Sequence, residues 1–213
     1  MGLDVKICGL KDQASIRAAA EAGAAYIGFV FFAGSPRAVT PGAAGDLAGF
    51  VPKEVNKVGV FVDAVDDLIR RACEQAGLDF LQLHGTESPQ RAAEIRKMTG
   101  RPIIKALPVE IEDDLMATAA FEGICDYLLF DARPPADSGR PGGNAVPFDW
   151  RLLEGRSFGA PWFLSGGLTA GNLNRAVGDS GARMVDVCSG VEVSPGVKSG
   201  RMIREFLSQA SGL

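Results

Sequence analysis

The sequence contains only one histidine, His84, and no pair of cysteines spaced as C-x-x-C. Zinc and iron sites in proteins usually draw on two or more imidazoles or on paired thiols, so we predict no metal site. The four cysteines are spread along the whole chain, at positions 8, 73, 125 and 188. This spacing, with no signal-peptide pattern at the start of the sequence, indicates reduced thiols in a cytoplasmic protein.

The sequence also lacks clusters of basic residues and long apolar runs. It has 22 Lys and Arg against 26 Asp and Glu, for a formal net charge of -4. A surface for nucleic acid needs clustered positive charge, and a transmembrane helix needs about 20 apolar residues in a row. We therefore predict no nucleic-acid partner and no membrane association. The apolar fraction of 46% is typical of a soluble globular protein with a sizeable core.

The sequence does contain a regular alternation of short apolar runs with helical stretches, which is typical of βα units around a parallel sheet. The expected strands are Val5–Cys8, Tyr26–Phe31, Lys57–Phe61, Phe80–His84, Ile103–Leu107, Tyr127–Phe130, Trp162–Ser165 and Met184–Cys188. The expected helical stretches are Asp12–Ala22, Gly42–Phe50, Val65–Ala76, Pro89–Met98, Glu112–Phe121, Asp149–Leu153, Ala170–Val177 and Lys198–Ser208. Eight such units in 213 residues predict an α/β fold, a single-domain (β/α)8 TIM barrel over residues 1–213.

The stretch from Asp131 to Asp149 departs from the short connections found elsewhere. It is rich in proline, glycine and alanine, and it is longer than a usual connection between a strand and a helix. Two interpretations are open: a lid over a binding site, or an excursion of the chain at the surface.

Polar residues and glycines lie at or just after the carboxyl ends of the expected strands. In a parallel barrel these ends meet at one rim, where binding and catalytic groups gather. Glycines that follow a strand expose backbone N–H groups, so Gly166-Gly167 and Ser189-Gly190 predict a phosphate site. The other rim residues are Cys8, Arg37, His84 and Asp131.

Alternation along the first strand places Lys6 on the same face as Cys8 and one layer deeper in the barrel. A buried charge needs a partner, and Asp186 on the neighbouring last strand can supply it. We therefore predict a Lys6–Asp186 pair inside the barrel. A lysine near a cysteine can also lower the pKa of the thiol.

The sequence resembles the phosphoribosylanthranilate isomerase family from the first strand to the last helix. The segments that carry the resemblance, in order, are Lys6-Ile7-Cys8-Gly9, Gly28-Phe29-Val30-Phe31, Ser35-Pro36-Arg37, Gly59-Val60-Phe61-Val62, Leu81-Gln82-Leu83-His84-Gly85, Phe130-Asp131, Phe148-Asp149-Trp150, Leu164-Ser165-Gly166-Gly167-Leu168 with Asn172, Asp186 to Glu192, and Pro195-Gly196-Val197-Lys198. As a set in register and order, they are far more specific than any one motif.

The resemblance implies an enzyme of tryptophan biosynthesis that converts N-(5-phosphoribosyl)anthranilate into the corresponding 1-deoxyribulose 5-phosphate. The reaction is an Amadori rearrangement, an aldose-to-ketose isomerisation of a phosphorylated small molecule, and it requires no cofactor. By position, Cys8 is expected to be the general base and Asp131 the general acid, while Arg37 binds the anthranilate carboxylate. The expected substrate-binding residues are Arg37, His84, Gly166, Gly167, Asp186, Ser189 and Gly190. His84 could instead only complete a hydrogen bond at the rim.

Two segments depart from the family pattern. After Asp131 the family usually carries a Gly-Gly-Thr-Gly-like turn, whereas this sequence has Gly142-Gly143-Asn144-Ala145. The family also tends to place an aspartate after the Gly-Val-Lys run, where this sequence has Ser199. Serine and aspartate are both good N-caps, so we expect the last helix to begin normally. The departures bear on loop closure and turnover rather than on the reaction.

Other functions fit the sequence less well. The related isomerase of histidine biosynthesis, alone or in a bifunctional form, uses an aspartate as base and binds two phosphates, whereas this chain has Cys8 and one obvious phosphate site. Indole-glycerol-phosphate synthase depends on a lysine acid and a longer N-terminal extension, and a pentose-phosphate epimerase needs histidine metal ligands. A catalytically silent barrel that binds a metabolite or a partner subunit is disfavoured by the presence of both Cys8 and Asp131. The sequence leaves monomer and homodimer open.

Overall fold

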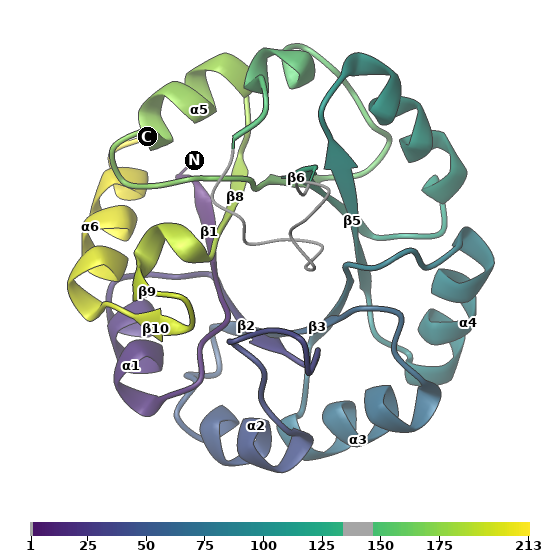
Figure 1. Ribbon diagram of the computed structural model, residues 1–213, viewed down its shortest axis with the longest axis vertical. Coiled ribbons are helices and arrows are strands. Elements are labelled where there is room, and N and C mark those ends of the chain that lie inside the picture. The colour runs from purple at the N-terminus through teal and green to yellow at the C-terminus, as the bar shows by residue number, and fades with distance from the viewer. Residues whose placement is uncertain (1, 134–146) are drawn as a thin grey trace.

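A computed structural model describes residues 2–133 and 147–213, and its strands form a closed parallel barrel (Figure 1). The order of the strands around the barrel follows the chain, and β8 pairs back onto β1. Their bounds are β1 Asp4–Cys8, β2 Tyr26–Val30, β3 Asn56–Phe61, β4 Phe80–Leu83, β5 Ile103–Val109, β6 Tyr127–Ala132, β7 Trp162–Leu164 and β8 Met184–Val187. Every predicted strand is present, with ends within two residues of the predicted ones. The TIM-barrel prediction is therefore confirmed.

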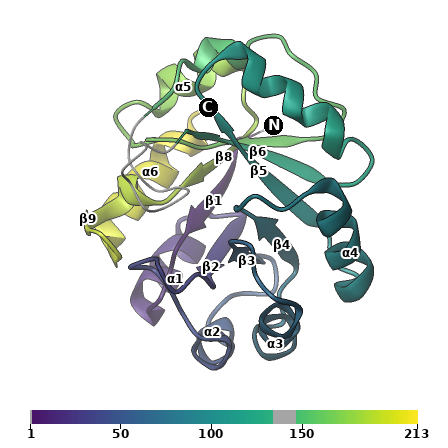
Figure 2. The ribbon, with the colours of Figure 1, turned by 45° about the vertical axis from the view of Figure 1, so that its right-hand side comes forward.

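Helical segments surround the barrel (Figure 1). The α-helices are α1 Gln13–Glu21, α2 Pro41–Ala48, α3 Asp66–Ala76, α4 Pro89–Thr99, α5 Leu173–Ser180 and α6 Gly200–Ser211. Two of the predicted helical stretches are 3-10 helices, η1 Glu112–Phe121 and η2 Trp150–Leu153. A short 3-10 helix, η3 Ser189–Val191, and an antiparallel hairpin of β9 Glu192–Ser194 and β10 Val197–Lys198 are additional to the predicted elements. Figure 2 shows β9 at the outer edge of the molecule, on the same side as α6.

Side-chain hydrogen bonds decide where the last two α-helices begin. Ser199 Oγ accepts a hydrogen bond from Met202 N at 3.3 Å, so α6 begins normally, as its predicted N-cap requires. Helix α5 begins at Leu173 rather than at the predicted Ala170. The reason is that Asn172 Oδ1 accepts a hydrogen bond from Thr169 N at 2.8 Å, which holds the preceding residues in a turn.

Apolar side chains form two layers. The larger one lies between the strands and the surrounding helices and includes Ile7, Phe29 and Phe206. A second cluster fills the barrel near the amino ends of the strands, where the rings of Tyr26 and Phe163 meet edge to face with centroids 5.3 Å apart. This plug leaves the opposite end of the barrel, at the carboxyl ends of the strands, available for binding.

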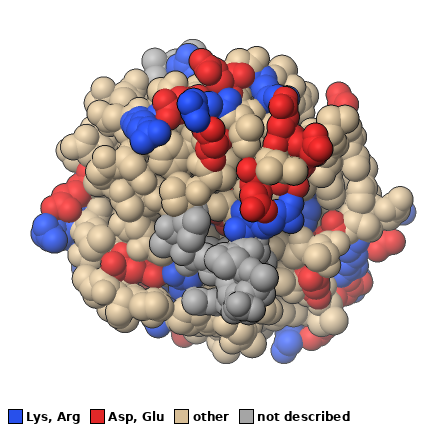
Figure 3. Space-filling view, turned by 45° about the horizontal axis from the view of Figure 1, so that its top comes forward, with Lys and Arg blue, Asp and Glu red and all other residues tan. Residues whose placement is uncertain are grey.

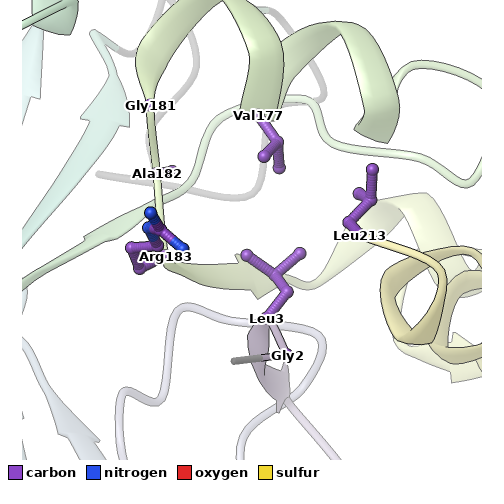
Figure 4. A pocket seen from close by; sticks show the side chains of 7 residues that line it. All are labelled: Gly2, Leu3, Val177, Gly181, Ala182, Arg183 and Leu213. Carbon is purple, nitrogen blue, oxygen red and sulfur yellow. The ribbon is translucent and has the colours of Figure 1, made fainter.

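A small pocket lies at the amino ends of the strands, near both chain termini (Figure 4). Its volume is about 200 Å³, and its lining is Gly2, Leu3, Val177, Gly181, Ala182, Arg183 and Leu213. Gly2 and Leu3 precede β1, and Gly181 to Arg183 precede β8. The pocket is therefore at the opposite end of the barrel from the predicted site.

Charged side chains of both signs lie on the surface. On the face shown in Figure 3, Lys and Arg side chains lie beside Asp and Glu side chains rather than in separate patches. One such surface pair is Arg96 with Asp126, at 2.7 Å. Among residues 2–133 and 147–213, no helix has the length and apolar character needed to cross a membrane.

Candidate active site

Cys8 is the last residue of β1, at the mouth of the barrel, and it is 6% exposed. Its side chain packs with Val30 and Val60 at the carboxyl ends of the two following strands. Gly28 of β2 makes room for it, because a Cβ at this glycine would lie 2.9 Å from Cys8 Sγ. The local sequence of β2 thus allows the thiol to lie inside the mouth.

Lys6 and Asp186 form an ion pair below Cys8, as the alternation along β1 predicts. Lys6 Nζ lies 2.9 Å from Asp186 Oδ1, and the two residues are paired in the register of β1 and β8. Burial opposes the ammonium charge, but Asp186 outweighs this effect, with a smaller contribution from Cys8, and raises the pKa of Lys6. Ser165 Oγ donates a further hydrogen bond to Asp186 Oδ2 at 3.3 Å. Lys6 is therefore charged and paired with the buried carboxylate of Asp186, which Ser165 also contacts.

A second thiol lies beside Cys8. Cys188 directly follows β8 and packs against the cluster of Cys8, Val30 and Val60. The neighbouring Cys188 and burial raise the pKa of Cys8 well above its ordinary value. Cys8, Lys198 and Arg37 lower the pKa of Cys188 to about 6 against the effect of burial. The surroundings therefore favour the thiolate form of Cys188 over that of Cys8.

Arg37 lies in the loop after β2 and is buried, with 4% of its surface exposed. Its Nε and Nη2 donate hydrogen bonds of 2.8 Å each to the two carboxylate oxygens of Glu192. Glu192 Oε1 also accepts a hydrogen bond from Lys198 Nζ at 2.9 Å. Burial opposes the carboxylate charge, but the two cations outweigh it and lower the pKa of Glu192 to about 2. The sequence does not indicate that Glu192 belongs to the site, because its partner Arg37 lies 155 positions away, in another loop.

Two glycines allow the Arg37 loop to approach its neighbours closely. Gly9 has φ of +76°, and a Cβ there would lie 2.8 Å from Arg37 Cδ. Gly196, with φ of +81° in the β9–β10 turn, faces the backbone carbonyl of Pro36 so closely that a Cβ would overlap it. Pro36 and the aliphatic part of Arg37 thus lie between the residue after β1 and the hairpin after β8.

Lys198 completes the cationic surroundings of Cys188. Its Nζ is fully buried and lies 2.8 Å from the carbonyl oxygen of Cys188 and 3.5 Å from Cys188 Sγ. The ammonium therefore touches both the backbone and the sulfur of the second thiol.

Asp131 lies near the end of β6, within the strand, and is 7% exposed. Its Oδ2 lies 3.2 Å from His84 Nε2, and its Oδ1 accepts a hydrogen bond from Ala132 N at 2.9 Å. On the other side of the imidazole, His84 Nδ1 lies 2.7 Å from Gln82 Nε2. His84 therefore links a buried amide inside the barrel to the carboxyl group at the mouth.

The orientation of the Gln82 amide decides what the imidazole offers to Asp131. With its NH2 group donating to Nδ1, a neutral His84 carries its proton on Nε2 and presents an N–H to Asp131. With the amide reversed, Gln82 Oε1 accepts from Nδ1–H, and a bare Nε2 can accept the proton of a protonated Asp131. Gln82 Oε1 is buried without a partner among the described residues, so either orientation leaves one amide group unpaired. The strand alternation that places Gln82 and His84 on one face is the signal in the sequence that identifies this chain of residues.

Cys8 and Asp131 approach the mouth from well-separated strands. Going around the barrel, β1 and β6 are separated by two strands on one side and by four on the other. The thiol and the carboxyl group therefore flank the mouth rather than standing side by side.

The four residues predicted to bind phosphate lie in adjoining loops. Gly166 and Gly167 follow β7 with φ of +87° and +65°, conformations that favour glycine. A Cβ on Gly166 would lie 2.8 Å from Ala132 N, and one on Gly190 would overlap the carbonyl oxygen of Leu168. The end of β6 is therefore in close contact with the loop after β7, which in turn contacts Gly190 after β8, and Ser189 and Gly190 form the start of η3.

A further buried ion pair supports the loop after β4. Lys105 Nζ lies 2.8 Å from Glu87 Oε2 and donates to the carbonyl oxygen of Gly85 at 2.8 Å. Glu87 in turn accepts a hydrogen bond from Gly85 N at 2.9 Å. The pair fixes Gly85, the residue next to His84, and no pattern in the sequence predicts it.

In the two described ranges, no group of three or more His, Cys, Asp or Glu side chains is arranged to hold a metal ion. All four cysteines are free. The predicted lid falls for the most part on residues 134–146, and Gly142-Gly143-Asn144-Ala145 with it, outside the residues that the structure describes.

Comparison with known proteins gives one consistent result. Residues 5–209 match the family model described as "N-(5'phosphoribosyl)anthranilate (PRA) isomerase". A protein of Paramagnetospirillum magneticum named N-(5'-phosphoribosyl)anthranilate isomerase is 49% identical over 212 residues, which cover 100% of this chain and 99% of that protein.

Solved structures agree with the sequence comparison. The chain is similar to the crystal structure of phosphoribosyl anthranilate isomerase from Thermotoga maritima, with a TM-score of 0.89, 32% identity, and coverage of 99% and 100% of the two chains. A second structure of such an isomerase, in complex with reduced 1-(o-carboxyphenylamino)-1-deoxyribulose 5-phosphate, has a TM-score of 0.86 at 32% identity, with the same coverage.

Proposed function

The chain belongs to the N-(5'-phosphoribosyl)anthranilate isomerase family of tryptophan biosynthesis, an enzyme family that interconverts an aldose and a ketose, and from this premise we propose how its barrel mouth performs the reaction. The reaction is a metal-free Amadori rearrangement of N-(5'-phosphoribosyl)anthranilate to 1-(2-carboxyphenylamino)-1-deoxyribulose 5-phosphate. The proposal depends above all on one observation, a thiol at the end of β1 and a carboxyl group at the end of β6 around one mouth.

Asp131 acts first, as the general acid. It gives a proton to the ring oxygen of the ribose, the bond between that oxygen and C1 breaks, and the nitrogen lone pair forms a Schiff base with C1. The reversed Gln82 amide described above suits this step, because a bare His84 Nε2 then stabilises the protonated carboxyl group before transfer.

Cys8 then acts as the general base. As a thiolate it removes the proton from C2, and the electrons of that bond form the C1–C2 double bond of an enolamine. Protonation at C1 and loss of the proton from the C2 hydroxyl group complete the ketose. No step changes the oxidation state of the protein, and none needs an electron acceptor.

The neighbouring groups allow Cys8 to become a thiolate. Cys188 packs beside it at the mouth, so moving the Cys8 proton to Cys188 converts Cys8 into the base. The charge that then develops on Cys8 lies next to the ammonium group of Lys6. The two thiols therefore hold one proton between them, over a fixed positive charge.

Arg37 and the glycine loops bind the two ends of the substrate. Glu192 occupies Nε and Nη2 of Arg37, and Nη1 makes no hydrogen bond to the described residues. This remaining nitrogen binds the anthranilate carboxylate as a charge-assisted donor. Gly166, Gly167, Ser189 and Gly190 bind the phosphate through backbone N–H groups. Fixing both anionic ends places the ribose between the acid and the base.

An assay with freshly formed phosphoribosylanthranilate tests this function. We expect the fluorescence of the substrate to disappear on addition of the enzyme, with the phosphoribosyl imidazole substrate of the histidine-pathway isomerase run in parallel. Consumption of the imidazole compound at a comparable rate would overturn the assignment to one substrate. No consumption of phosphoribosylanthranilate would overturn the proposed reaction.

A further inference from the structure

Cys8 is the last residue of β1, and Cys188 directly follows the neighbouring strand β8. The register pairs Ile7 of β1 with Val187 of β8, and the two cysteines are the next residues along the chain in each case. Side chains alternate along a strand, so both thiols share the inner face with the Lys6–Asp186 pair. Neighbouring parallel strands lie about 4.8 Å apart, within the Cα separation of about 4.4–6.8 Å that a disulfide spans. The spacing of the two strands therefore suits a disulfide between the two cysteines.

The two thiols differ in charge and in access. Cys188 is partly exposed, and its sulfur lies 3.5 Å from the Lys198 ammonium group, which favours the thiolate by lowering the pKa of Cys188. Cys8 is buried, and its pKa is raised, which favours the protonated thiol. Thiolates, not thiols, react with oxidants, so Cys188 is the reactive partner and Cys8 the one that resolves it.

The other cysteines lack these features. Cys73 lies on α3 and Cys125 precedes β6, and burial raises the pKa of both thiols, that of Cys125 to about 11. Among the described residues, Cys8 and Cys188 are the two cysteines that share one cluster at the mouth of the barrel.

We propose that Cys188 and Cys8 form a reversible disulfide when the protein meets hydrogen peroxide. The Cys188 thiolate attacks one peroxide oxygen, forming an S–O bond and breaking the O–O bond, and hydroxide leaves. The Cys8 sulfur then attacks the Cys188 sulfur, the S–O bond breaks, and the oxygen leaves as water with the Cys8 proton. Two thiols are oxidised to one disulfide, and one peroxide is reduced.

The disulfide removes the sulfur lone pair that abstracts the C2 proton, so it switches the isomerase off. This effect on turnover rests on the proposed role of Cys8 as base. Formation of the bond itself rests only on the geometry and charge of the two thiols.

The chemical test uses the intact wild-type protein treated with hydrogen peroxide. We expect a mass lower by about 2 Da, because two hydrogens leave, and a non-reduced peptide digest that links the segments containing Cys8 and Cys188. Reduction with dithiothreitol restores the original mass. A stable addition of oxygen atoms without a link, or a link that involves Cys73 or Cys125, would overturn the proposal.

Turnover of the same samples tests the switch. We expect a loss of at least about tenfold that reduction reverses, since removing a general base typically costs 10²–10⁴ in rate. Each variant is compared with its own untreated sample. Cys188→Ser and Cys188→Ala lose the recovery on reduction, whereas Cys73→Ser keeps the behaviour of the wild type. Recovery in both Cys188 variants would overturn the proposal.

The results separate this inference from the proposed function. A mapped Cys8–Cys188 disulfide with unchanged turnover rejects Cys8 as the base and leaves the modification site standing. Absence of the disulfide, in a protein that consumes phosphoribosylanthranilate, rejects the modification site and leaves the reaction standing.

Discussion

The two sides of the barrel mouth are held by different kinds of interaction. On the side of β1 and β8, Cys8 lies above the buried Lys6–Asp186 pair and beside a second ion pair, Arg37 with Glu192. The charges in each pair are fixed by close partners, at 2.9 Å and 2.8 Å. This side is an ionic framework around a thiol.

On the side of β4 and β6, Asp131 is approached by His84, which is in turn approached by Gln82. Here a chain of groups that can donate or accept reaches the carboxyl group, and the buried Lys105–Glu87 pair on this side contacts Gly85 in the loop after β4. The comparison explains how the two roles divide. A base must become negatively charged when it takes up its role, which nearby fixed cations favour, whereas an acid must release its proton and take it back, which reversible hydrogen bonds allow.

The largest expected effect comes from replacing the reacting group on either side of the mouth. We expect Cys8→Ser and Asp131→Asn each to lower kcat by about 10²–10⁴, the typical contribution of general acid–base catalysis. Binding of inorganic phosphate should persist in both, because the glycine loops are untouched. Cys73→Ser on α3 is the matched control and should retain the wild-type rate. If the kcat of either variant lies within about tenfold of the wild-type value, the substituted residue is not the acid or base of the reaction.

The second effect is on stability, and it should appear on the ionic side. Lys6→Met leaves the Asp186 carboxylate buried without its cation, and breaking a buried pair in this way costs about 3–5 kcal/mol of unfolding free energy. The double variant Lys6→Met with Asp186→Leu removes both charges and should recover most of that loss. Denaturant unfolding of both variants measures the difference. Equal losses in the single and double variants would show that the pair is held by packing rather than by charge.

The barrel was predictable from the sequence because each βα unit is a local pattern. Runs such as Tyr127–Phe130 predict a strand from their apolar character alone. Lys6 and Asp186 were also predictable, since alternation puts Lys6 inside the barrel and closure puts the last strand beside it. The apolar pattern does not show how far the pairing of each strand with its neighbours extends. Strand β6 accordingly ends at Ala132 rather than at the predicted Phe130.

The ionic framework beyond Lys6 was not predictable for a different reason. Arg37 and Glu192 lie in loops after β2 and β8, and their contact depends on the close approach of Gly196 to Pro36. Neither loop has a periodicity that fixes its path. The hydrogen-bond chain on the other side could have been found, because Gln82 is a polar residue at an inward-facing strand position two residues before His84.

The third effect is a pH dependence of stability that belongs to the ionic side. The pKa of Glu192 is lowered from 4.5 to about 2 in the folded protein. A carboxyl group with a lowered folded-state pKa stabilises the fold above its unfolded pKa, and that stability is lost as the pH falls from about 4.5 toward 2. We expect Glu192→Gln to lose roughly 3 kcal/mol near neutral pH and much less at pH about 2.

Urea unfolding at a series of acidic pH values measures this dependence. Glu205→Gln is the matched control, since Glu205 is half-exposed and pairs with Arg201 on the surface of α6. Its variant should lose little stability and show the same pH slope as the wild type. A parallel slope for Glu192→Gln and the wild type would mean that the Arg37 pair does not hold the carboxylate charge.

The smallest expected effect is on the hydrogen-bonding side, and it tests whether Gln82 positions the acid. Gln82→Met keeps the shape of the side chain but leaves His84 Nδ1 without a partner. We expect kcat to fall about tenfold, the equivalent of one hydrogen bond, with KM nearly unchanged and the pH profile of kcat shifted. Gln82→Glu offers Nδ1 only an acceptor, so it selects the bare Nε2 that suits a protonated Asp131 and should turn over faster than the methionine variant.

The chain makes this last prediction directly observable, because His84 is its only histidine. Nitrogen-15 NMR of the imidazole therefore reports which ring nitrogen is protonated without any assignment step. Gln82→Glu should place the proton on Nδ1, and Gln82→Met should leave the two tautomers mixed, with kcat following the fraction that has a bare Nε2. Loss of stability in both variants with the pH profile and the tautomer unchanged would reduce Gln82 to a packing residue. In that case the position of the acid would depend on His84 and Asp131 alone. The difference between the two sides of the mouth would then be limited to the residues that lie at the mouth itself.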